Sequence, residues 1–412
     1  MLETLAEIEF NEFTKKNSIF FQSSYWGNLK EANGWKQHLV GIKENNEIIA
    51  ASLLLAKKIP LFNKYIFYAP RGFVLNYKNK YLLKQYTNEI KKYIKRNNGI
   101  FIKINPLISY QERDVNGDVV ENGLNNKDVV KTLKELGFKH NTKGNDLEPH
   151  FISVLNLENK TEDELLKEMR STTRWSIKNS YKNSLRIIEA GKEDLINFKE
   201  LMKHTSERRG FIDRPLHYYE SMYDSFNDSN NIKVLLVEFN AEEQITKYKE
   251  DIESISKKLN HAKEKQKEGQ IKEFESQIIS IEKKIEEVNQ LKEKYGNKKI
   301  IAGGLYMLFG NQIVYLFGAS LKPFMKYNSQ YLLQWEMIKY ALKNNYQKFN
   351  FYGIDPAFDP KDSMYGLFDF KRGFNSKVVE LIGEFTLVTN RFYYILYNIT
   401  FKLYRKAKKV LK

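Results

Sequence analysis

Cationic and aromatic side chains gather in two short segments of this sequence. The first segment, 208–219, carries three arginines, among them Arg214, and two adjacent tyrosines, Tyr218 and Tyr219. Guanidinium groups bind phosphate and carboxylate through paired hydrogen bonds, so this segment predicts a grip on a diphosphate or a peptide carboxylate. A capped loop that begins a helix is the alternative interpretation.

The second segment, 368–374, places Lys371 and Arg372 beside a glycine in an aromatic setting that includes Phe370. A partly buried lysine can hold a phosphate or stabilise the oxyanion that develops during acyl transfer. A structural salt bridge is the alternative interpretation.

The motifs that are missing narrow the chemistry. The chain has no cysteine, which excludes disulfides, thiolate nucleophiles and cysteine-ligated metals, and its six histidines include no pair at helical metal-binding spacing. No P-loop occurs, no G-x-G-x-x-G follows a strand, and the pyrophosphate loop of coenzyme A acetyltransferases is not evident. We therefore expect no metal and no cofactor, and any acyl donor should be a separate molecule.

The charge of the chain favours polyanionic partners. Its 412 residues carry a formal net charge of +16. Nucleic acid, a nucleotide-linked substrate or an anionic membrane face would all complement this charge. A coding bias toward lysine and asparagine would produce the same composition.

The last residues of the chain concentrate this charge. From Arg391 to Lys412 there are seven basic residues and no acidic one, mixed with aromatic residues such as Tyr393. We predict that this tail packs against the protein and also makes peripheral contact with an anionic membrane face.

The start of the chain has Glu3, Glu7 and Glu9 where a secretory leader would be basic, and no apolar run reaches the roughly 18 residues that span a bilayer. The predicted location is therefore the cytoplasm, with peripheral contact at the inner face of the cell membrane.

A heptad pattern in residues 241–296 predicts the most distinctive positioning element. Apolar residues recur every three or four positions in two runs separated by Gly269: Ile252, Ile255, Leu259 and Ala262, then Ile271, Phe274, Ile278, Ile281, Ile285 and Val288. Two short antiparallel runs can satisfy each other, so we expect an inserted helical hairpin in preference to a dimerising coiled coil. Apolar strand patterns at 234–237 and 300–305 flank this arm, which therefore interrupts a β-hairpin.

The second of these strands belongs to an internal repeat. Four features occur twice in the same order: apolar strands at 48–53 and 300–305, aromatic strands at 65–69 and 313–318, helices at 80–96 and 329–343, and strands that end in Asn105 and Asp355. The order predicts two copies of one α/β unit, each with a mixed sheet, and a substrate cleft where the copies meet.

We therefore predict an α/β (α+β) fold with two domains. The first spans 1–150, and the second spans 151–390 and is interrupted by the arm at 241–296. The basic aromatic tail, 391–412, should pack back on the first domain.

The chain resembles the FemABX peptidyltransferases, which build the interpeptide bridges of peptidoglycan. The resemblance covers essentially the whole chain and rests on the motifs at 20–26 (FFQSSYW), 174–178 (RWSIK), 209–211 (RGF), 315–320 (YLFGAS) and the pair Phe370 and Lys371. It implies two tandem N-acetyltransferase-like domains. As in FemA-type members, it also implies an antiparallel coiled-coil hairpin in the second domain, similar to the arm of seryl-tRNA synthetase.

The reaction implied by this resemblance is the transfer of glycine, alanine or serine from an aminoacyl-tRNA. An amino group on the stem peptide of lipid II or of UDP-MurNAc-pentapeptide attacks the ester carbonyl. Because the ester is already activated, the charged tRNA is a co-substrate and no cofactor is implied. The attacking amine must first lose a proton, and a lysine-like pKa of about 10.4 leaves few such amines neutral near pH 7.

Carried over residue by residue, the resemblance assigns five side chains to precursor binding and two to the aminoacyl end of the tRNA and the transition state. The first set is Lys30, Trp35, Arg214, Tyr218 and Tyr315, and the second, catalytic set is Phe370 and Lys371. The chain departs from the family at Asn105, where an aspartate proposed as general base is expected. An amide cannot take a proton at physiological pH, so another group or the substrate itself must serve. Asp355 occupies the equivalent position in the second repeat.

Two other functions remain open on the sequence. One is a coenzyme A-dependent N-acyltransferase, and the other is a non-catalytic adaptor that binds partners through its coiled-coil arm. A homodimer, or a complex with a second Fem-family protein, is a further expectation.

Overall fold

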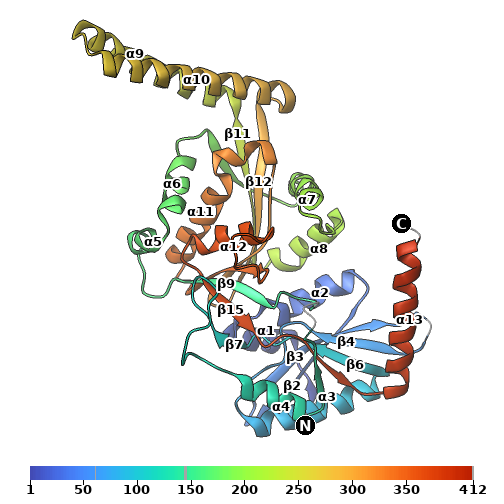
Figure 1. Cartoon of the computed structure of the whole chain (residues 1–412). Coiled ribbons are helices and arrows are strands. Elements are labelled where there is room, and N and C mark those ends of the chain that lie inside the picture. The colour runs from blue at the N-terminus through green and yellow to red at the C-terminus, as the bar shows by residue number, and fades with distance from the viewer. Residues whose placement is uncertain (61, 143–145, 411–412) are drawn as a thin grey trace.

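The computed structural model describes residues 1–60, 62–142 and 146–410. Two eight-stranded sheets, each with helices packed on it, form two bodies, and a long helical arm projects from the second body (Figure 1). The predicted α/β class, with two sheets and an inserted helical hairpin, is confirmed.

The first sheet contains parallel and antiparallel pairs. From edge to edge it contains β1 (Glu3–Thr4), β2 (Lys36–Glu44), β3 (Glu47–Lys58), β4 (Tyr65–Ala69), β6 (Gly99–Ile104), β16 (Phe385–Val388) and β8 (Phe138–His140), and β5 (Val74–Leu75) pairs with β3. The spatial order of its strands follows their order in the sequence except near one edge, where β16 lies between β6 and β8.

The second sheet repeats this plan. From edge to edge it contains β10 (Leu185–Glu189), β11 (Ile232–Asn240), β12 (Lys298–Phe309), β13 (Gln312–Ser320), β14 (Lys348–Ile354), β9 (Phe151–Asn156), β15 (Lys377–Leu381) and β7 (Ser109–Glu112). In each sheet an antiparallel hairpin, β3–β4 or β12–β13, is followed by one parallel pairing, β4 with β6 or β13 with β14. The predicted internal repeat is therefore present.

Two strands cross between the bodies. β16, from near the end of the chain, lies between β6 and β8 of the first sheet. β7, from the first half of the chain, is an edge strand of the second sheet and pairs with β15. The predicted domain boundary between residues 150 and 151 stays a prediction. It lies at the end of the segment that connects β8 of the first sheet to β9 of the second.

Helices cover the sheets because their apolar residues recur at helical spacing. Leu83, Tyr86, Ile90 and Ile94 form the buried face of α3, whose first turn is capped by the Asn79 side chain. The helices of the two bodies are α1 (Glu7–Lys16), α2 (Ser24–Ala32), α3 (Lys80–Arg96), α4 (Lys127–Glu135), α5 (Glu162–Glu168), α6 (Ser171–Ser180), α7 (Leu195–Arg209), α8 (Leu216–Asn227), α11 (Ser329–Lys343) and α12 (Tyr365–Arg372), with short 3-10 helices at Phe20–Gln22 and Lys322–Tyr327.

The arm consists of α9 (Ala241–Glu264) and α10 (Glu268–Tyr295), which pack side by side as an antiparallel pair. It emerges between β11 and β12, which pair directly at Asn240 and Lys298, so it interrupts a β-hairpin as predicted. The turn lies at 265–267 and not at Gly269, which falls in the first turn of α10. The prediction of Gly269 as the break was wrong because a glycine is tolerated in the first helical turn.

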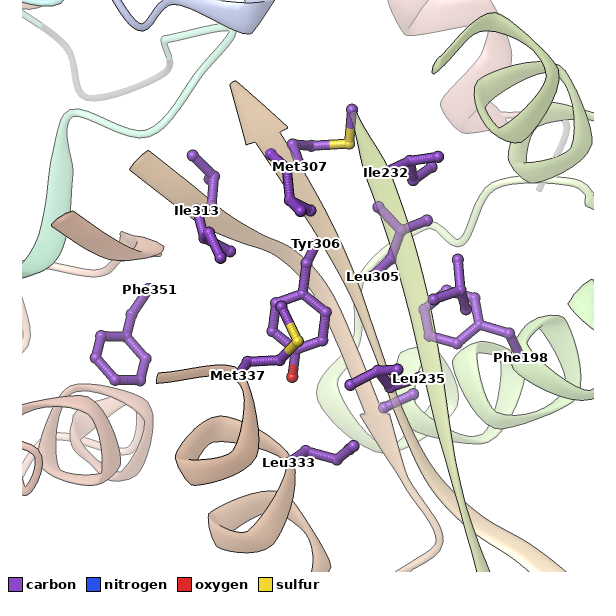
Figure 2. Close-up of a cluster of buried hydrophobic side chains, with 14 of the residues drawn as sticks. Phe198, Ile232, Leu235, Leu305, Tyr306, Met307, Ile313, Leu333, Met337 and Phe351 are labelled. Atoms are coloured by element: carbon purple, nitrogen blue, oxygen red, sulfur yellow. The ribbon is translucent and has the colours of Figure 1, made fainter. Parts of the chain in front are cut away.

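The largest hydrophobic core extends through both bodies. In the second body it packs α7 and α11 against opposite faces of the sheet, as Phe198 and Met337 show in Figure 2. The same cluster continues to the first body, where the Phe20 and Phe226 rings meet at 6.4 Å. The seam between the bodies is therefore packed like a protein interior, which makes it a rigid support for a site.

The chain ends in α13 (Arg391–Val410), which lies along the first body (Figure 1). Its Tyr394 and Tyr397 rings each lie 5.4 Å from the Phe101 ring of β6. Residues 411 and 412 of the predicted tail lie outside the described residues. None of the described helices is both long enough and apolar enough to cross a lipid bilayer.

Candidate functional site

A cluster of cations and aromatic rings lies at the seam, where α2 of the first body packs against α8 of the second. The Lys30 ammonium lies 4.5 Å from the centre of the Trp26 ring and donates a 3.4 Å hydrogen bond to the Tyr218 hydroxyl. The Arg214 guanidinium also lies against the ring of this tyrosine, 5.3 Å from the ring centre. Three of the predicted precursor-binding residues, Lys30, Arg214 and Tyr218, are thus brought together from the two halves of the chain.

One carboxylate, that of Glu148, serves this cluster. Glu148 lies in the connection between the bodies, is half-buried and accepts a short hydrogen bond from the Tyr352 hydroxyl. Its charge acts on Lys30 and on Tyr218, so it lies within electrostatic reach of both. Burial, followed by the Glu148 charge, raises the pKa of Tyr352 well above its usual value, so the phenol stays protonated and donates to the carboxylate.

Burial also tunes the cationic side of the cluster. It lowers the pKa of Lys30 to about 8, an effect that Glu148 opposes and Arg214 reinforces. Burial raises the pKa of Tyr218 to about 12, so this phenol is neutral at physiological pH. Lys30 therefore remains a cation at pH 7 but holds its proton weakly. An anion bound beside it would raise its pKa and so strengthen its hold on the proton.

Asn105 holds a buried turn beside this cluster. Its side-chain oxygen accepts a 2.8 Å hydrogen bond from the Arg71 backbone N–H and a 3.3 Å hydrogen bond from the Tyr68 hydroxyl. Arg71 has a positive φ of 54° and donates from its guanidinium to the Pro149 carbonyl at 2.9 Å. Asn105 thus fixes Arg71, which in turn fixes the segment that carries Glu148.

A pocket of about 740 Å³ opens next to Glu148 at the seam. Its ionisable lining is mainly acidic and comes from the connecting segment and from the ends of β14 and β15: Asp146, Glu148, Asp355 and Glu380, with His140 and His150. Among the described residues of the lining there is no lysine or arginine. Asp146 and Glu380 are paired with His150, and Glu380 is also paired with Arg113. Glu148 and Asp355 then supply the negative charge that suits a cationic group such as an alkylammonium, whereas the neighbouring Lys30 and Arg214 suit an anion.

Phe370 and Lys371 form a second group, on α12. The Phe370 ring packs against Tyr331 at 5.0 Å and Phe374 at 5.5 Å. Lys371 is buried, and its ammonium donates 2.6 Å hydrogen bonds to the carbonyls of Phe351 and Gly353 in β14. Burial lowers the pKa of Lys371 to about 7, and the Asp355 charge opposes this shift.

The two groups meet at Tyr352. The carbonyls that Lys371 binds lie on either side of this residue, which has a positive φ of 63° and sits at a register shift in β14. Its backbone N–H donates to the Asn350 side chain at 2.8 Å. Lys371 therefore supports the bend that directs the Tyr352 hydroxyl to Glu148.

Tyr315 and Trp35 lie elsewhere. Tyr315 stacks on Tyr306 at 5.3 Å and donates to the Gln330 side chain at 2.9 Å, so it lies on the α11 side of the second sheet. Trp35 follows α2, and the nearest cation to its ring is Lys57 at 5.6 Å. Trp26, which the sequence analysis did not single out as a site residue, takes the position beside Lys30.

Glu148, Arg71 and Tyr352 were missed because none of them is in a recognisable motif. The available signal was position: Glu148 precedes a proline in the connection between the two repeats, which must pass the cleft. The described residues contain no group of three or more His, Cys, Asp or Glu side chains that could hold a metal ion.

Known proteins share the whole of this architecture. The model of the FemAB family matches residues 5–402. Aminoacyltransferase FemA of Staphylococcus aureus (strain bovine RF122 / ET3-1) is 33% identical over 409 residues, which cover 96% of each chain. Aminoacyltransferase FemA of Staphylococcus epidermidis (strain ATCC 12228 / FDA PCI 1200) is 32% identical over 423 residues, which cover 99% of each chain. The crystal structure of FemX matches with a TM-score of 0.76 and 26% identity, covering 96% of this chain and 99% of that chain. This chain therefore belongs to the FemAB family.

Proposed function

We propose that this protein transfers glycine, alanine or serine from an aminoacyl-tRNA to an amino group on the stem peptide of a peptidoglycan precursor. The relatives are aminoacyltransferases by name, and they align over nearly the whole chain. The observation that carries the proposal is Glu148, because this carboxylate lines the acidic pocket and also interacts with Lys30 of the cationic cluster.

The cationic cluster binds the anionic part of the acceptor. Lys30 and Arg214 come from different bodies and both lie against the Tyr218 ring, so an anion bound by both would be held across the seam. A phosphate of lipid II or of UDP-MurNAc-pentapeptide has the charge that Lys30 and Arg214 complement.

The acidic pocket receives the acceptor ammonium. Glu148 binds it and takes one proton, and the neutral amine nitrogen then attacks the ester carbonyl carbon. The new amide bond forms and the ester C–O bond breaks, and the second proton lost by the attacking nitrogen goes to the leaving oxygen, so the tRNA leaves with its terminal ribose hydroxyl restored. The aminoacyl-tRNA ester supplies the activation, so the reaction uses no added cofactor.

Lys371 acts mainly as a positioning residue in this proposal. Two of its three N–H donors hold the carbonyls on either side of Tyr352, and the Tyr352 hydroxyl orients Glu148. When Lys371 is protonated, its third donor would serve the aminoacyl ester, whose approach along α12 would also bring it to Phe370.

The experiment that tests the function combines purified protein, one charged tRNA at a time and either lipid II or UDP-MurNAc-pentapeptide. Glycyl-, alanyl- and seryl-tRNA are supplied separately, and mass spectrometry follows the acceptor. We expect the acceptor to gain one amino-acid residue with at least one charged tRNA and none with uncharged tRNA. An unchanged acceptor under all of these conditions would contradict the proposal, as would equal transfer from an acyl-coenzyme A.

A further inference from the structure

The terminal helix α13 presents large apolar side chains on two of its sides. On the inner side, Tyr393, Tyr394 and Tyr397 join a hydrophobic cluster with Ile59 and Phe101 of the first body. On the outer side, three further side chains are open to solvent: Phe392 is 70% exposed, and Ile395 and Ile399 are each 52% exposed. The inner contacts account for the attachment of the helix but leave the outer side chains unexplained.

The three outer side chains form one stripe. Positions 392, 395 and 399 are separated by three and four residues, which places them on the same face of a helix. Isolated exposed apolar residues are ordinary, whereas a continuous apolar stripe at the surface marks a docking site.

The sequence that carries this stripe is basic. Arg391 precedes it and is exposed, and between 402 and 409 the sequence adds Lys402, Arg405, Lys406, Lys408 and Lys409. No acidic residue occurs from 391 to 412. From the first body, Lys64 and Lys139 lie 5.0 and 5.2 Å from the centres of the Tyr393 and Tyr394 rings. The helix is thus basic in sequence, and Lys64 and Lys139 of the first body add two cations beside its inner tyrosines.

We propose that the outer face of α13 docks on an anionic lipid surface, with Phe392, Ile395 and Ile399 entering the boundary between headgroups and acyl chains. The helix of 20 residues is about 30 Å long and would lie along the surface. The exposed Arg391 would then meet the lipid phosphates, and the net positive charge of the segment 391–412 adds electrostatic attraction to the apolar contact.

A second copy of this chain would fit the face poorly. A two-fold contact would place one cationic helix against an identical cationic helix, and the charges would repel. Three side chains also fall far short of the roughly 800 Å² that each partner buries in a stable protein interface.

The test measures partitioning of the full-length protein to vesicles by co-sedimentation. Vesicles of phosphatidylglycerol in phosphatidylcholine are compared with pure phosphatidylcholine, at low and high salt. The variant F392S/I395S/I399S removes the stripe and leaves the inner tyrosines in place. The control I8S/I196S/I279S removes three exposed isoleucines from α1, α7 and α10, where they form no stripe. Thermal unfolding checks that both variants are folded.

We expect the wild type and the control to bind anionic vesicles and to release them as salt rises. The stripe variant should bind on the order of 100-fold more weakly, because the free energy of insertion follows the apolar area that is buried. Equal binding by the stripe variant and the control would overturn the proposal, as would a wild type that does not prefer anionic vesicles. A dimer that forms without vesicles and is lost only in the stripe variant would overturn it in favour of a second copy. Vesicle binding needs no substrate, so this result is independent of the transferase assay.

Discussion

At the scale of single residues, the site is organised by a carboxylate that no motif contains. Glu148 accepts a hydrogen bond from the Tyr352 hydroxyl and lines the acidic pocket. Asn105 holds the turn at Arg71, although the family resemblance led us to expect a base at its position. The side-chain nitrogen of Asn105 is buried without a hydrogen-bond partner among the described residues. Asn105 therefore supports the backbone, and in the proposed mechanism the proton transfer falls to Glu148.

Replacement of Glu148 by glutamine should lower kcat about 100- to 1,000-fold, because the amide keeps the shape of the side chain but cannot take a proton. The measurement is the initial rate of aminoacyl transfer at saturating acceptor. Asp355→Asn is the matched control, because Asp355 lines the same pocket and is exposed. Its rate should stay within a few-fold of the wild type. Loss of activity in Asp355→Asn with retention in Glu148→Gln would assign the base to Asp355 instead.

His150 offers a test of the segment that carries Glu148. Burial disfavours its charge, but the carboxylates of Asp146 at 3.2 Å and Glu380 at 3.9 Å raise the pKa of His150 to about 9, from a usual value of 6.5. Because the folded state binds this proton more tightly than the unfolded chain, the stabilisation is complete below about pH 6.5. It is lost as the pH rises to about 9.

The wild type should therefore lose stability relative to His150→Gln between pH 6.5 and 9. The loss is at most about 3 kcal/mol in the free energy of unfolding. Urea unfolding of both proteins at several pH values across this range measures it. A difference that stays constant with pH would show that the proton on His150 does not hold the segment.

At the scale of elements, the strands of the second sheet fix where aromatic side chains lie. Gly318 in β13 leaves room for the Tyr315 ring, because a methyl group added at Gly318 would lie 1.5 Å from the Tyr315 hydroxyl oxygen. The pair explains how Tyr315 can fold back over its own strand and reach Gln330 on α11. A register shift between Leu305 and Tyr306 opposite this point accommodates the crowding.

Gly318→Ala should displace Tyr315 and lower the free energy of unfolding by about 1–3 kcal/mol, the usual cost of overpacking. Gly366→Ala is the control, because a methyl group there meets nothing within 4 Å and the residue lies in α12. That variant should be neutral or more stable by about 0.5–1 kcal/mol, since alanine favours the helix. Urea denaturation of the two variants measures their free energies of unfolding. Equal values for Gly318→Ala and Gly366→Ala would contradict the packing argument.

At the scale of the whole molecule, the two bodies depend on each other. β16 fills the gap between β6 and β8, and β7 completes the edge of the second sheet beside β15. The main hydrophobic core is continuous through the seam. The site at the seam is thus held by strand pairing and apolar packing, and hinge motion between the bodies would disrupt both.

A fragment of residues 1–150 should fail to fold alone, because it lacks β16 and leaves the facing edges of β6 and β8 unpaired. The fragment 151–412 should restore its structure on mixing. Circular dichroism and urea titration measure both states. A chain that ends at Asn390 is the control, since it keeps β16 and loses only α13, and it should unfold cooperatively. A cooperative transition of fragment 1–150 alone would show that the bodies are independent.

The sequence by itself determined the features that depend on neighbours along the chain. The heptads of the arm, the repeated order of strands and helices, and the arginine and lysine segments are all local patterns, and local patterns survive without knowledge of distant contacts. The motif resemblance assigned Lys30, Arg214 and Tyr218 to one functional set. Their distances along the chain do not predict that they meet in space.

Only the tertiary structure decided which side chains share the seam. Glu148 and Tyr352 are 204 positions apart in the sequence, and Lys103 of β6 is 281 positions from its ion-pair partner Glu384, which precedes β16. Such pairings are set by the net burial of apolar surface and by the pairing of strand edges over the whole chain. No window of sequence contains that information, which is why the carboxylate at the centre of the site became visible only in the folded protein.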